Sequence, residues 1–498
     1  MKPSILFPLV SLLALTAHAQ TTVTVDARAA KPISPDLVGI FFEDLNYAAD
    51  GGLYAELVQN RSFEYNAAEQ PNWGQLTAWD VVRRGGGAGD VLADVSCPVH
   101  PNNPHCALLL VGNPGEGVGL SNAGFDGIPV KEGDKYDFSA FARMINVGGG
   151  RGNRPVGKFP LNVRLETKDG ALLGEANVEA SDPSEWKRLT ATLTASQTVP
   201  DARLVILGKS AGAVQLDEIS LFPQKTFKGR KNGLRADLAQ AIADIHPKFV
   251  RFPGGCLAHG DGLSNIYRWK DTIGPVERRK GQPNIWRYHQ SVGLGYFEYF
   301  QFCEDIGAKP LPVLAAGVSC QNSSRARGTG QQCIPMENMP AYVQEVLDLV
   351  EYANGPATSK WGSMRAAAGH PAPFGLKYLG IGNEDHITPG FKERFQMIFE
   401  AVRKKHPEII VVGTVGPAPD GEDFTKGWQI ANELRVPMVD EHYYKPPQWF
   451  WENLHRYDGY DRAKPKVYLG EYAAHDDHRR STLRAALAEA ACLTSLER

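Results

Sequence analysis

The sequence has little that would direct it to a nucleic acid or into a membrane. Its 498 residues include 53 lysines and arginines and 56 aspartates and glutamates, a formal charge of −3. So small an excess gives no electrostatic reason to bind nucleic acid or anionic lipid. The apolar run at residues 5–15 is shorter than the roughly 20 residues that a membrane-spanning helix requires. We therefore expect neither a nucleic-acid partner nor a membrane-spanning segment.

The same apolar run has the features of an export signal. Met1 and Lys2 precede it, and Ala17 and Ala19 follow it with the spacing of a small-residue cleavage site. We predict that residues 1–19 form a signal peptide and that cleavage follows Ala19. The mature chain would be exported, to the periplasm or to the medium.

The cysteines are few and odd in number, seven in all. Cys97 and Cys106 flank a proline-rich loop, and Cys320 and Cys333 flank a polar one. In an exported protein, each pair is placed to close a loop disulfide. The cysteines left as free thiols would be Cys256, Cys303 and Cys492.

From about residue 233 onward, helix-like and strand-like segments alternate, which is typical of βα units and a parallel sheet. Amphipathic segments predict helices at residues 234–245, 296–306, 341–352, 391–405 and 483–496. Apolar segments predict strands at residues 37–42, 248–252, 311–315, 377–381, 409–412, 438–444 and 466–469. The pattern favours the α/β class and a (β/α)8 TIM barrel.

Only seven barrel strands are recognisable in these 498 residues. A barrel closes when its last strand pairs with its first, so an eighth strand is needed. We therefore expect the chain to be a fragment of a longer reading frame.

Residues 63–225 follow a different pattern. Short alternating segments are separated by glycine, proline, asparagine and aspartate, which predicts an inserted all-β sandwich. Its tryptophans, Trp73, Trp79 and Trp186, are expected to pack in the core. The predicted domains are the signal peptide at 1–19, an N-terminal strand and first barrel strand at 20–62, the insertion at 63–225, and the remaining, truncated barrel at 226–498.

Two glutamates stand at the ends of predicted barrel strands. Glu384 follows the strand at 377–381, and Glu471 follows the strand at 466–469. The carboxyl ends of barrel strands form the catalytic face, and hydrolysis of a glycosidic bond requires two facing carboxylates. Either glutamate alone is more readily explained as a solvated surface charge. Their joint placement predicts a glycosidase.

Six motifs occur in a fixed order: GIFFED at 39–44, VRFPGG at 250–255, WKDTIGP at 269–275, GNE at 382–384, DEHYY at 440–444 and GEYA at 470–473. Together they resemble glycoside hydrolase family 51, the α-L-arabinofuranosidases, over residues 22–498. The insertion resembles a family 4/9 carbohydrate-binding module. The resemblance implies a retaining exo-glycosidase that releases terminal α-L-arabinofuranosyl residues from arabinoxylan, arabinan and related oligosaccharides. It also implies a C-terminal β-sandwich, which is not recognisable here.

The resemblance also implies roles for individual residues. Glu384 would be the general acid/base and Glu471 the nucleophile. Asn383 would contact the sugar 2-hydroxyl, Glu43 would hold arabinose hydroxyls, and Tyr444 would orient the nucleophile. The other candidate substrate-binding residues are Cys256, Trp269 and His442.

Several of these residues have a second interpretation. Glu43 is also compatible with a surface charge, and His442 with a histidine at the barrel rim that makes only structural hydrogen bonds. Arg251 is placed either to support carboxylates under the site or to contact substrate. Trp269 and Trp449 can stack on sugar rings, but aromatic side chains in loops also pack structurally.

The sequence departs from many relatives at Ala258-His259-Gly260, where they have Val-Glu-Gly. Substrate preference is therefore the least certain part of the resemblance, and a β-xylosidase or endoglucanase of the same clan stays open. A carbohydrate-binding protein without activity is a third interpretation.

No metal or organic cofactor is expected, because the loop with Cys97, His100, His105 and Cys106 matches no standard zinc spacing. The expected partners are arabinose-containing plant polysaccharides and oligosaccharides and, by family analogy, further copies of the chain in a homo-oligomer.

Overall fold

The computed structural model describes residues 33–145, 157–181, 183–323 and 330–497, together with residues 22, 24 and 28. The signal peptide predicted at residues 1–19 lies outside the described residues. The chain divides into two compact units, Met1–Leu37 and Val38–Arg498, and every element below belongs to the second. Among the described residues, no helix combines the length and the hydropathy needed to cross a bilayer.

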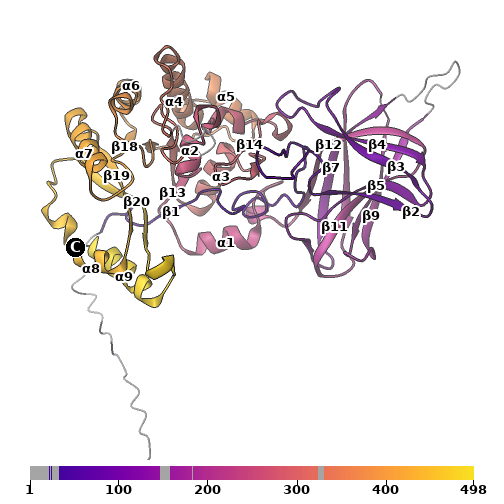
Figure 1. Ribbon diagram of the computed structural model, residues 1–498, viewed down its shortest axis with the longest axis horizontal. Helices are drawn as coiled ribbons and strands as arrows, with labels where there is room; N and C mark the ends of the chain where they lie inside the picture. Colours follow the sequence, from indigo (N-terminus) through magenta and orange to yellow (C-terminus); the bar gives the residue numbers. More distant parts are fainter. Residues whose placement is uncertain are drawn as a thin grey trace, which may run out of the picture. The chain divides into compact units, whose positions relative to one another are not determined.

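A seven-stranded parallel sheet carries the glutamates (Figure 1). Side chains from opposite parts of the sheet meet, since the rings of Phe249 and Tyr468 lie 5.4 Å apart. The sheet is thus a nearly closed barrel, and within the described part of the chain no strand joins its two edges. The strands in order are β1 (Ile40–Phe41), β13 (Phe249–Phe252), β16 (Lys309–Leu314), β17 (Tyr378–Ile381), β18 (Ile410–Thr414), β19 (Met438–Lys445) and β20 (Lys466–Ala474).

The barrel interior is filled by side chains from successive strands. Leu311 and Val313 of β16 pack with Tyr378 of β17, and Phe249, Ile410, Met438 and Tyr468 close the layer. Alternate residues of a strand point to the same face, which explains the spacing of Leu311 and Val313. The interior is therefore a packed core, and the chemistry is confined to the ends of the strands.

Helices cover the outside of the barrel. Helix α6 (Pro389–Lys405) illustrates why they form: the Thr388 side chain accepts the Phe391 N–H at the start, and a proline occupies the first turn. Phe391, Phe395 and Phe399 then recur every four residues and face the core. The other helices are α1 (Ala236–Asp244), α2 (Cys256–His259), α3 (Tyr296–Ile306), α4 (Met339–Asn354), α5 (Lys360–Ala367), α7 (Glu422–Leu434), α8 (Pro447–Glu452) and α9 (Leu483–Ser495).

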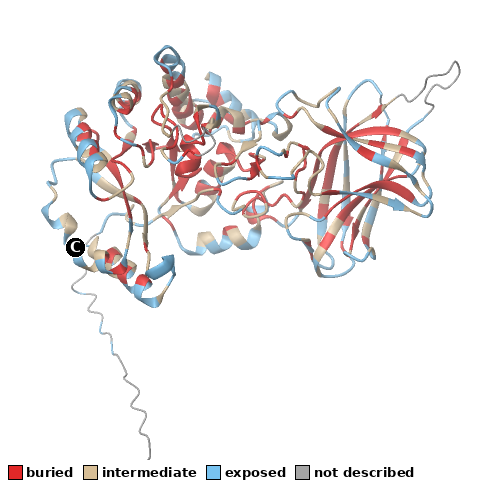
Figure 2. Cartoon of the chain, viewed as in Figure 1, coloured by how far each residue is buried: buried red, intermediate tan, exposed pale blue. Residues whose placement is uncertain are grey.

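The inserted region is a β-sandwich, as predicted. Buried side chains from both sheets, including Leu109, Leu120, Phe138 and Val163, form one hydrophobic cluster. Figure 2 shows buried stretches, in red, along strands of this region. One sheet has the order β10 (Lys187–Thr194), β7 (Lys135–Ile145), β12 (Gly212–Pro223), β4 (Cys106–Asn113) and β3 (Ala88–Asp94). The other has β2 (Trp79–Arg84), β5 (Gly117–Asn122), β11 (Val199–Gly208), β8 (Phe159–Glu166) and β9 (Leu172–Ala180), with β6 (Ile128–Val130) paired to β11. A separate hairpin is formed by β14 (Gln282–Pro283) and β15 (His289–Gln290).

The predicted disulfides are wrong, because all seven cysteines are free thiols. The sulfur of Cys320 lies in a buried cluster with Cys256 and His259 and does not pair with Cys333. Cys106 is fully buried on β4, whereas Cys97 is partly exposed in the preceding loop.

Candidate active site

Glu471 lies on β20 beside a β-bulge. The pairing of β19 with β20 passes from Glu441 opposite Leu469 to His442 opposite Glu471, so Gly470 is the extra residue. A Cβ at Gly470 would lie 2.1 Å from Asp440 Oδ1, so glycine at this position leaves room for the Asp440 carboxylate. The bulge places Glu471 level with His442 on the neighbouring strand.

Three side chains hold Glu471 as a carboxylate. Arg251 Nη1 donates to Oε1 at 2.7 Å, Tyr444 Oη donates to Oε2 at 2.9 Å, and His442 Nδ1 lies 3.8 Å from Oε2. Burial alone would raise the pKa of Glu471, but the charges of His442 and Arg251, with the hydrogen bonds from Arg251 and Tyr444, lower it below the usual value. Glu471 is therefore in the ionised state that a nucleophile requires.

Arg251 supports the site from below. Its side chain has no exposed surface, and Nη2 donates to Asn383 Oδ1 at 2.6 Å. The same nitrogen lies 3.6 Å from Asp440 Oδ2, and the guanidinium lies over the Phe41 ring. These contacts match the interpretation of Arg251 as a structural partner of carboxylates and leave no face open to a substrate.

Glu384 follows β17 and lies close to Glu471. Its Oε1 is 3.0 Å from His442 Nδ1, and its Oε2 accepts a hydrogen bond from Gln321 Nε2 at 3.3 Å. One oxygen of each glutamate and a ring nitrogen of His442 lie within 4.8 Å of one another. Retaining glycosidases place their two carboxyl groups about 5–5.5 Å apart, whereas inverting enzymes need a wider gap for water. A closest approach of the two carboxylates within 4.8 Å leaves less room than an inverting pair needs.

His442 links the two glutamates electrostatically. Its Nδ1 faces both of them, and its Nε2 lies 3.2 Å from Asp440 Oδ2. Burial alone would lower the pKa of His442, but the charges of Glu471 and Asp440 raise it well above the usual value. The protonated imidazole and Arg251 together place two positive charges at Glu471. The cluster therefore disfavours a cation although its atoms are close enough to hold one.

Glu43 and Asn383 form another wall of the site. Glu43 Oε1 accepts the backbone N–H groups of Gly255 at 2.9 Å and Leu257 at 3.0 Å, and burial raises its pKa. A Cβ on Gly255 would lie 2.4 Å from Glu471 Oε1 and 2.9 Å from Asn383 Oδ1. Glycine is therefore required here for the carboxylates to approach the loop. Glu43 points into the site and is not a solvated surface charge.

Two predicted contacts are differently placed. Trp269 has no exposed surface; its indole N–H donates to the Glu345 carbonyl at 3.0 Å and its ring packs on Trp361, so the predicted sugar contact is not supported. Trp449 packs on Phe450. Cys256 is buried beside Asn383, with Nδ2 4.0 Å from Sγ. Trp269 is a packing residue, because its segment forms a 3-10 turn that is buried in the core around α4 and α5.

Sequence reasoning missed two residues that contact the glutamates or their histidine. Gln321 lies in the loop after β16, whose sequence shows only a polar segment between Cys320 and Cys333. Asp440 belongs to the DEHYY motif, and its position two residues before His442 on the same strand places both side chains on one face. That spacing was the available signal for Asp440; nothing in the sequence marks Gln321.

The sequence and the fold were compared with known proteins. Residues 241–462 match the α-L-arabinofuranosidase 1 domain family. The chain is 42% identical to an extracellular exo-α-L-arabinofuranosidase of Streptomyces chartreusis, over 97% of this chain and 56% of that protein. It is 35% identical to α-L-arabinofuranosidase 1 of Arabidopsis thaliana, over 96% of this chain and 67% of that protein.

A solved structure of an arabinose-bound family 51 α-L-arabinofuranosidase is also similar. It shares 31% identity with a TM-score of 0.79, over 93% of this chain and 73% of that one. The chain thus spans little more than half the length of the Streptomyces relative and about two thirds of the plant one. The motifs, the paired carboxylates and these relatives agree, and the chain belongs to glycoside hydrolase family 51, the α-L-arabinofuranosidases.

Proposed function

We propose that the protein is a retaining exo-glycosidase that releases terminal non-reducing α-L-arabinofuranosyl residues from arabinoxylan, arabinan and related oligosaccharides. The observation that carries the proposal is the approach of Glu384 and Glu471 to within 4.8 Å at the end of the barrel. The relatives' names, which include an exo-acting arabinofuranosidase, support the substrate class.

In the first step, Glu384 gives its proton to the leaving-group oxygen while Glu471 attacks the anomeric carbon. A covalent glycosyl ester forms and the bond to the leaving alcohol breaks. Esterified Glu471 carries no charge, so it no longer repels a carboxylate on the neighbouring glutamate. In the second step, Glu384 takes a proton from water, and the hydroxyl oxygen displaces Glu471 from the sugar.

Glu43, Asn383, Cys256 and Tyr444 are the proposed sugar-binding residues. Glu43 Oε1 is occupied by two backbone N–H groups, so Oε2 is the oxygen available to a sugar hydroxyl. Arg251 fixes the Asn383 amide by binding its Oδ1, which directs the NH2 group toward the opposite side. Such fixed groups orient the furanose without reorganising during the reaction.

A panel of aryl glycosides tests the reaction and its substrate. We expect the protein expressed from the full reading frame that contains this chain to hydrolyse 4-nitrophenyl α-L-arabinofuranoside, and Glu471→Ala to be inactive. Folded protein that hydrolyses the β-xyloside or a glucan but not the arabinofuranoside would contradict the substrate. Protein that binds polysaccharide and hydrolyses none of them would contradict the enzyme assignment.

We also propose that the sandwich at residues 63–225 binds plant polysaccharide, on the basis of its two-sheet fold. The Glu471→Ala variant should be depleted from solution by insoluble arabinan or arabinoxylan, and free arabinose should not release it. Release by arabinose would place the binding in the barrel instead.

We further propose that the protein is exported, because residues 1–19 have the features of a signal peptide. The N-terminal sequence of the secreted protein should then begin at Gln20.

A further inference from the structure

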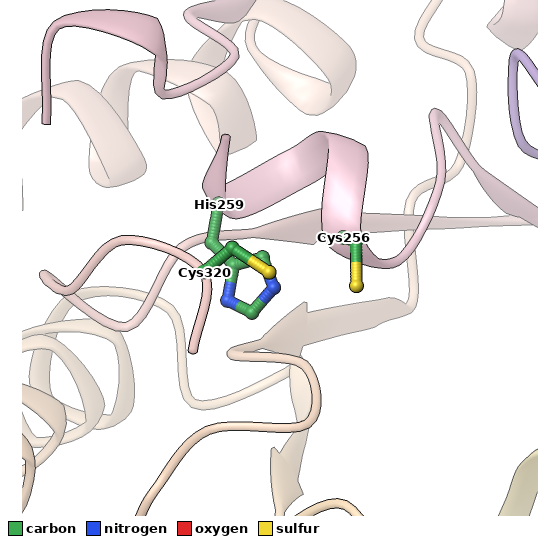
Figure 3. Close-up of side chains that lie close together, drawn as sticks. All are labelled: Cys256, His259 and Cys320. Carbon is green, nitrogen blue, oxygen red and sulfur yellow. The ribbon is translucent and has the colours of Figure 1, made fainter. Parts of the chain in front are cut away.

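A second cluster of side chains lies beside the segment that carries Glu384. Cys256 and His259 on α2 and Cys320 after β16 bring two sulfurs and a ring nitrogen within 4.8 Å of one another (Figure 3). Cys256 is 7% exposed, and the other two have no exposed surface. The proposed hydrolysis takes no proton and forms no bond at His259 or Cys320. Three good metal ligands therefore converge in the interior, and two of them, His259 and Cys320, have no role in the proposed reaction.

His259 is oriented for coordination. Its Nδ1 lies 2.9 Å from Asp385 Oδ1, an ion-pair distance inside the core. That contact occupies Nδ1 and leaves Nε2, which is buried and has no hydrogen-bond partner among the described residues. A carboxylate that holds one ring nitrogen while the other binds a metal is the usual arrangement around a metal-ligating histidine.

One hydrogen-bond donor lies beside each sulfur, although a hydrogen bond with Cys320 and burial raise the pKa of Cys256 well above its usual value in the metal-free protein. The Asn322 backbone N–H donates to Cys320 Sγ at 3.4 Å. The Asn383 Nδ2 group lies 4.0 Å from Cys256 Sγ, and Arg251 fixes the orientation of that amide. In the metal-free protein the Cys320 thiol faces Gln321 Oε1 at 3.3 Å, which holds its proton. Donors at sulfur stabilise the charged form over the neutral one.

We propose that Cys256, His259 and Cys320 bind one zinc ion, or a divalent cation of similar softness, with Asp385 orienting the imidazole. Two thiolates and one imidazole are a ligand set that zinc uses, with its fourth position left for water or another group. Metal–ligand bonds of about 2.0–2.3 Å require ligand atoms roughly 3.5–4 Å apart, so the cluster needs only a small contraction.

His259 is protonated in the metal-free protein: burial would lower its pKa, but Asp385 raises it to about 10. The dication therefore displaces three protons into solvent, one from each thiol and one from His259 Nε2, and accepts the lone pair of that nitrogen. Two thiolates then neutralise the metal, and the lost imidazolium proton leaves the interior with one more negative charge, on Asp385. No oxidant or reductant is involved.

The metal would clamp three segments that build the active site. Helix α2 carries the Leu257 N–H that holds Glu43, Cys320 precedes Gln321, and Asp385 follows Glu384. Bound metal would fix these segments relative to one another before substrate arrives. His259 and Cys320 take no part in the proposed hydrolysis, and metal content is measured without any substrate.

Cobalt substitution and metal analysis test the proposal. The reduced full-length protein is first stripped of metal with a chelator and then incubated with Zn2+. Mass spectrometry of the metal eluted from the protein should then give one equivalent of Zn2+ per chain. With Co2+ it should develop thiolate-to-cobalt charge-transfer absorption in the near ultraviolet. Cys320→Ser and His259→Gln should lose that band, and Asp385→Asn should weaken Co2+ binding about 10–100-fold.

Cys303→Ser is the matched control, because Cys303 is a buried free thiol of helix α3 in the main core. It should bind Co2+ as the parent does. If Cys320→Ser does not fold, Cys320→Ala replaces it in the Co2+ experiment. Circular dichroism verifies the folding of each variant. The proposal is overturned if the reduced protein takes up no stoichiometric metal, if the band survives Cys320→Ala, or if Cys256 and Cys320 form a disulfide that reducing agent opens without creating a metal site.

Discussion

Arg251 and Glu471 form a buried ion pair across the barrel, with 2.7 Å between Nη1 and Oε1. Arg251 belongs to β13, next to the first strand of the sheet, and Glu471 belongs to β20, the last. One contact therefore connects strands from the two ends of the sheet and also sets the charge of the proposed nucleophile. The same ion pair therefore contributes to the packing of the barrel and to the ionisation of Glu471.

Arg251→Met tests that double role. The variant keeps a side chain of similar length but leaves a carboxylate buried without its partner, so the free energy of unfolding should fall by about 3–5 kcal/mol. The pKa of Glu471 should rise, which moves the acid limb of the kcat/KM profile to higher pH. Denaturant titration and a pH–rate profile measure the two effects.

The control for that variant is Arg279→Met, which breaks a buried pair with Glu298 away from the site. The free energy of unfolding of Arg279→Met should fall, but the acid limb of its kcat/KM profile should stay at the same pH as in the parent protein. Because Glu471 has a depressed pKa in the folded state, its share of stability is present above its ordinary value of 4.5 and lost as pH falls through the folded value. An acid limb that stays fixed in Arg251→Met would contradict the assignment.

His442→Gln tests the charge on the histidine. The pKa of His442 is raised on folding, so its ionic contacts stabilise the protein fully below the unfolded value of 6.5. That stabilisation is lost as pH rises from 6.5 through the folded pKa. The Tm difference between the parent and His442→Gln should therefore be largest in acid and shrink in alkali. A difference that grows with pH would show that His442 is buried in the neutral form.

Tyr444→Phe removes the hydrogen bond to Glu471 Oε2 while keeping the ring. A hydrogen bond to a charged group contributes about 1.5–3 kcal/mol, so kcat should fall about tenfold to a hundredfold. Tyr472→Phe, on β20 next to Glu471, is the control and should leave kcat unchanged. Equal effects of the two substitutions would remove the proposed role of Tyr444.

Trp269→Phe distinguishes packing from sugar stacking. Loss of the indole creates a small cavity and leaves the Glu345 carbonyl without its donor, which should cost about 1–3 kcal/mol of unfolding free energy. KM for the aryl arabinofuranoside should not change. A raised KM with unchanged stability would restore the sugar contact.

The barrel elements were predictable because their periodicity is strong. Helix α3 was predicted with its observed ends, and the strand that precedes Glu384 was predicted within one residue. Helix α5 was missed because its apolar residues do not form a clear face, and α8 because it begins in a pair of prolines. The predicted strand at 37–42 shrinks to Ile40–Phe41, because only those residues pair with β13.

Site residues were predictable from the sequence where they lie at the ends of strands. They were not predictable where the path of a loop brings them to the site. Glu384, Asn383 and Glu471 converge because parallel strands end at one face. Gln321 reaches the site through a loop whose path has no sequence signal. Trp269 lies in the WKDTIGP motif, yet only the packing around it reveals that it is buried. The Cys256–Cys320 proximity was likewise hidden by the sequence distance between them.

Chemical rescue by azide measures the roles of the two glutamates most directly. With an activated aryl arabinofuranoside, Glu384→Ala should form the ester with Glu471 and yield the α-arabinofuranosyl azide, since azide needs no general base. Its kcat/KM on unactivated substrates should fall about 10²–10⁴-fold. Glu471→Ala should yield the β-azide by direct displacement, and NMR of the products distinguishes the two. The opposite assignment of anomers would contradict Glu471 as nucleophile and Glu384 as acid/base.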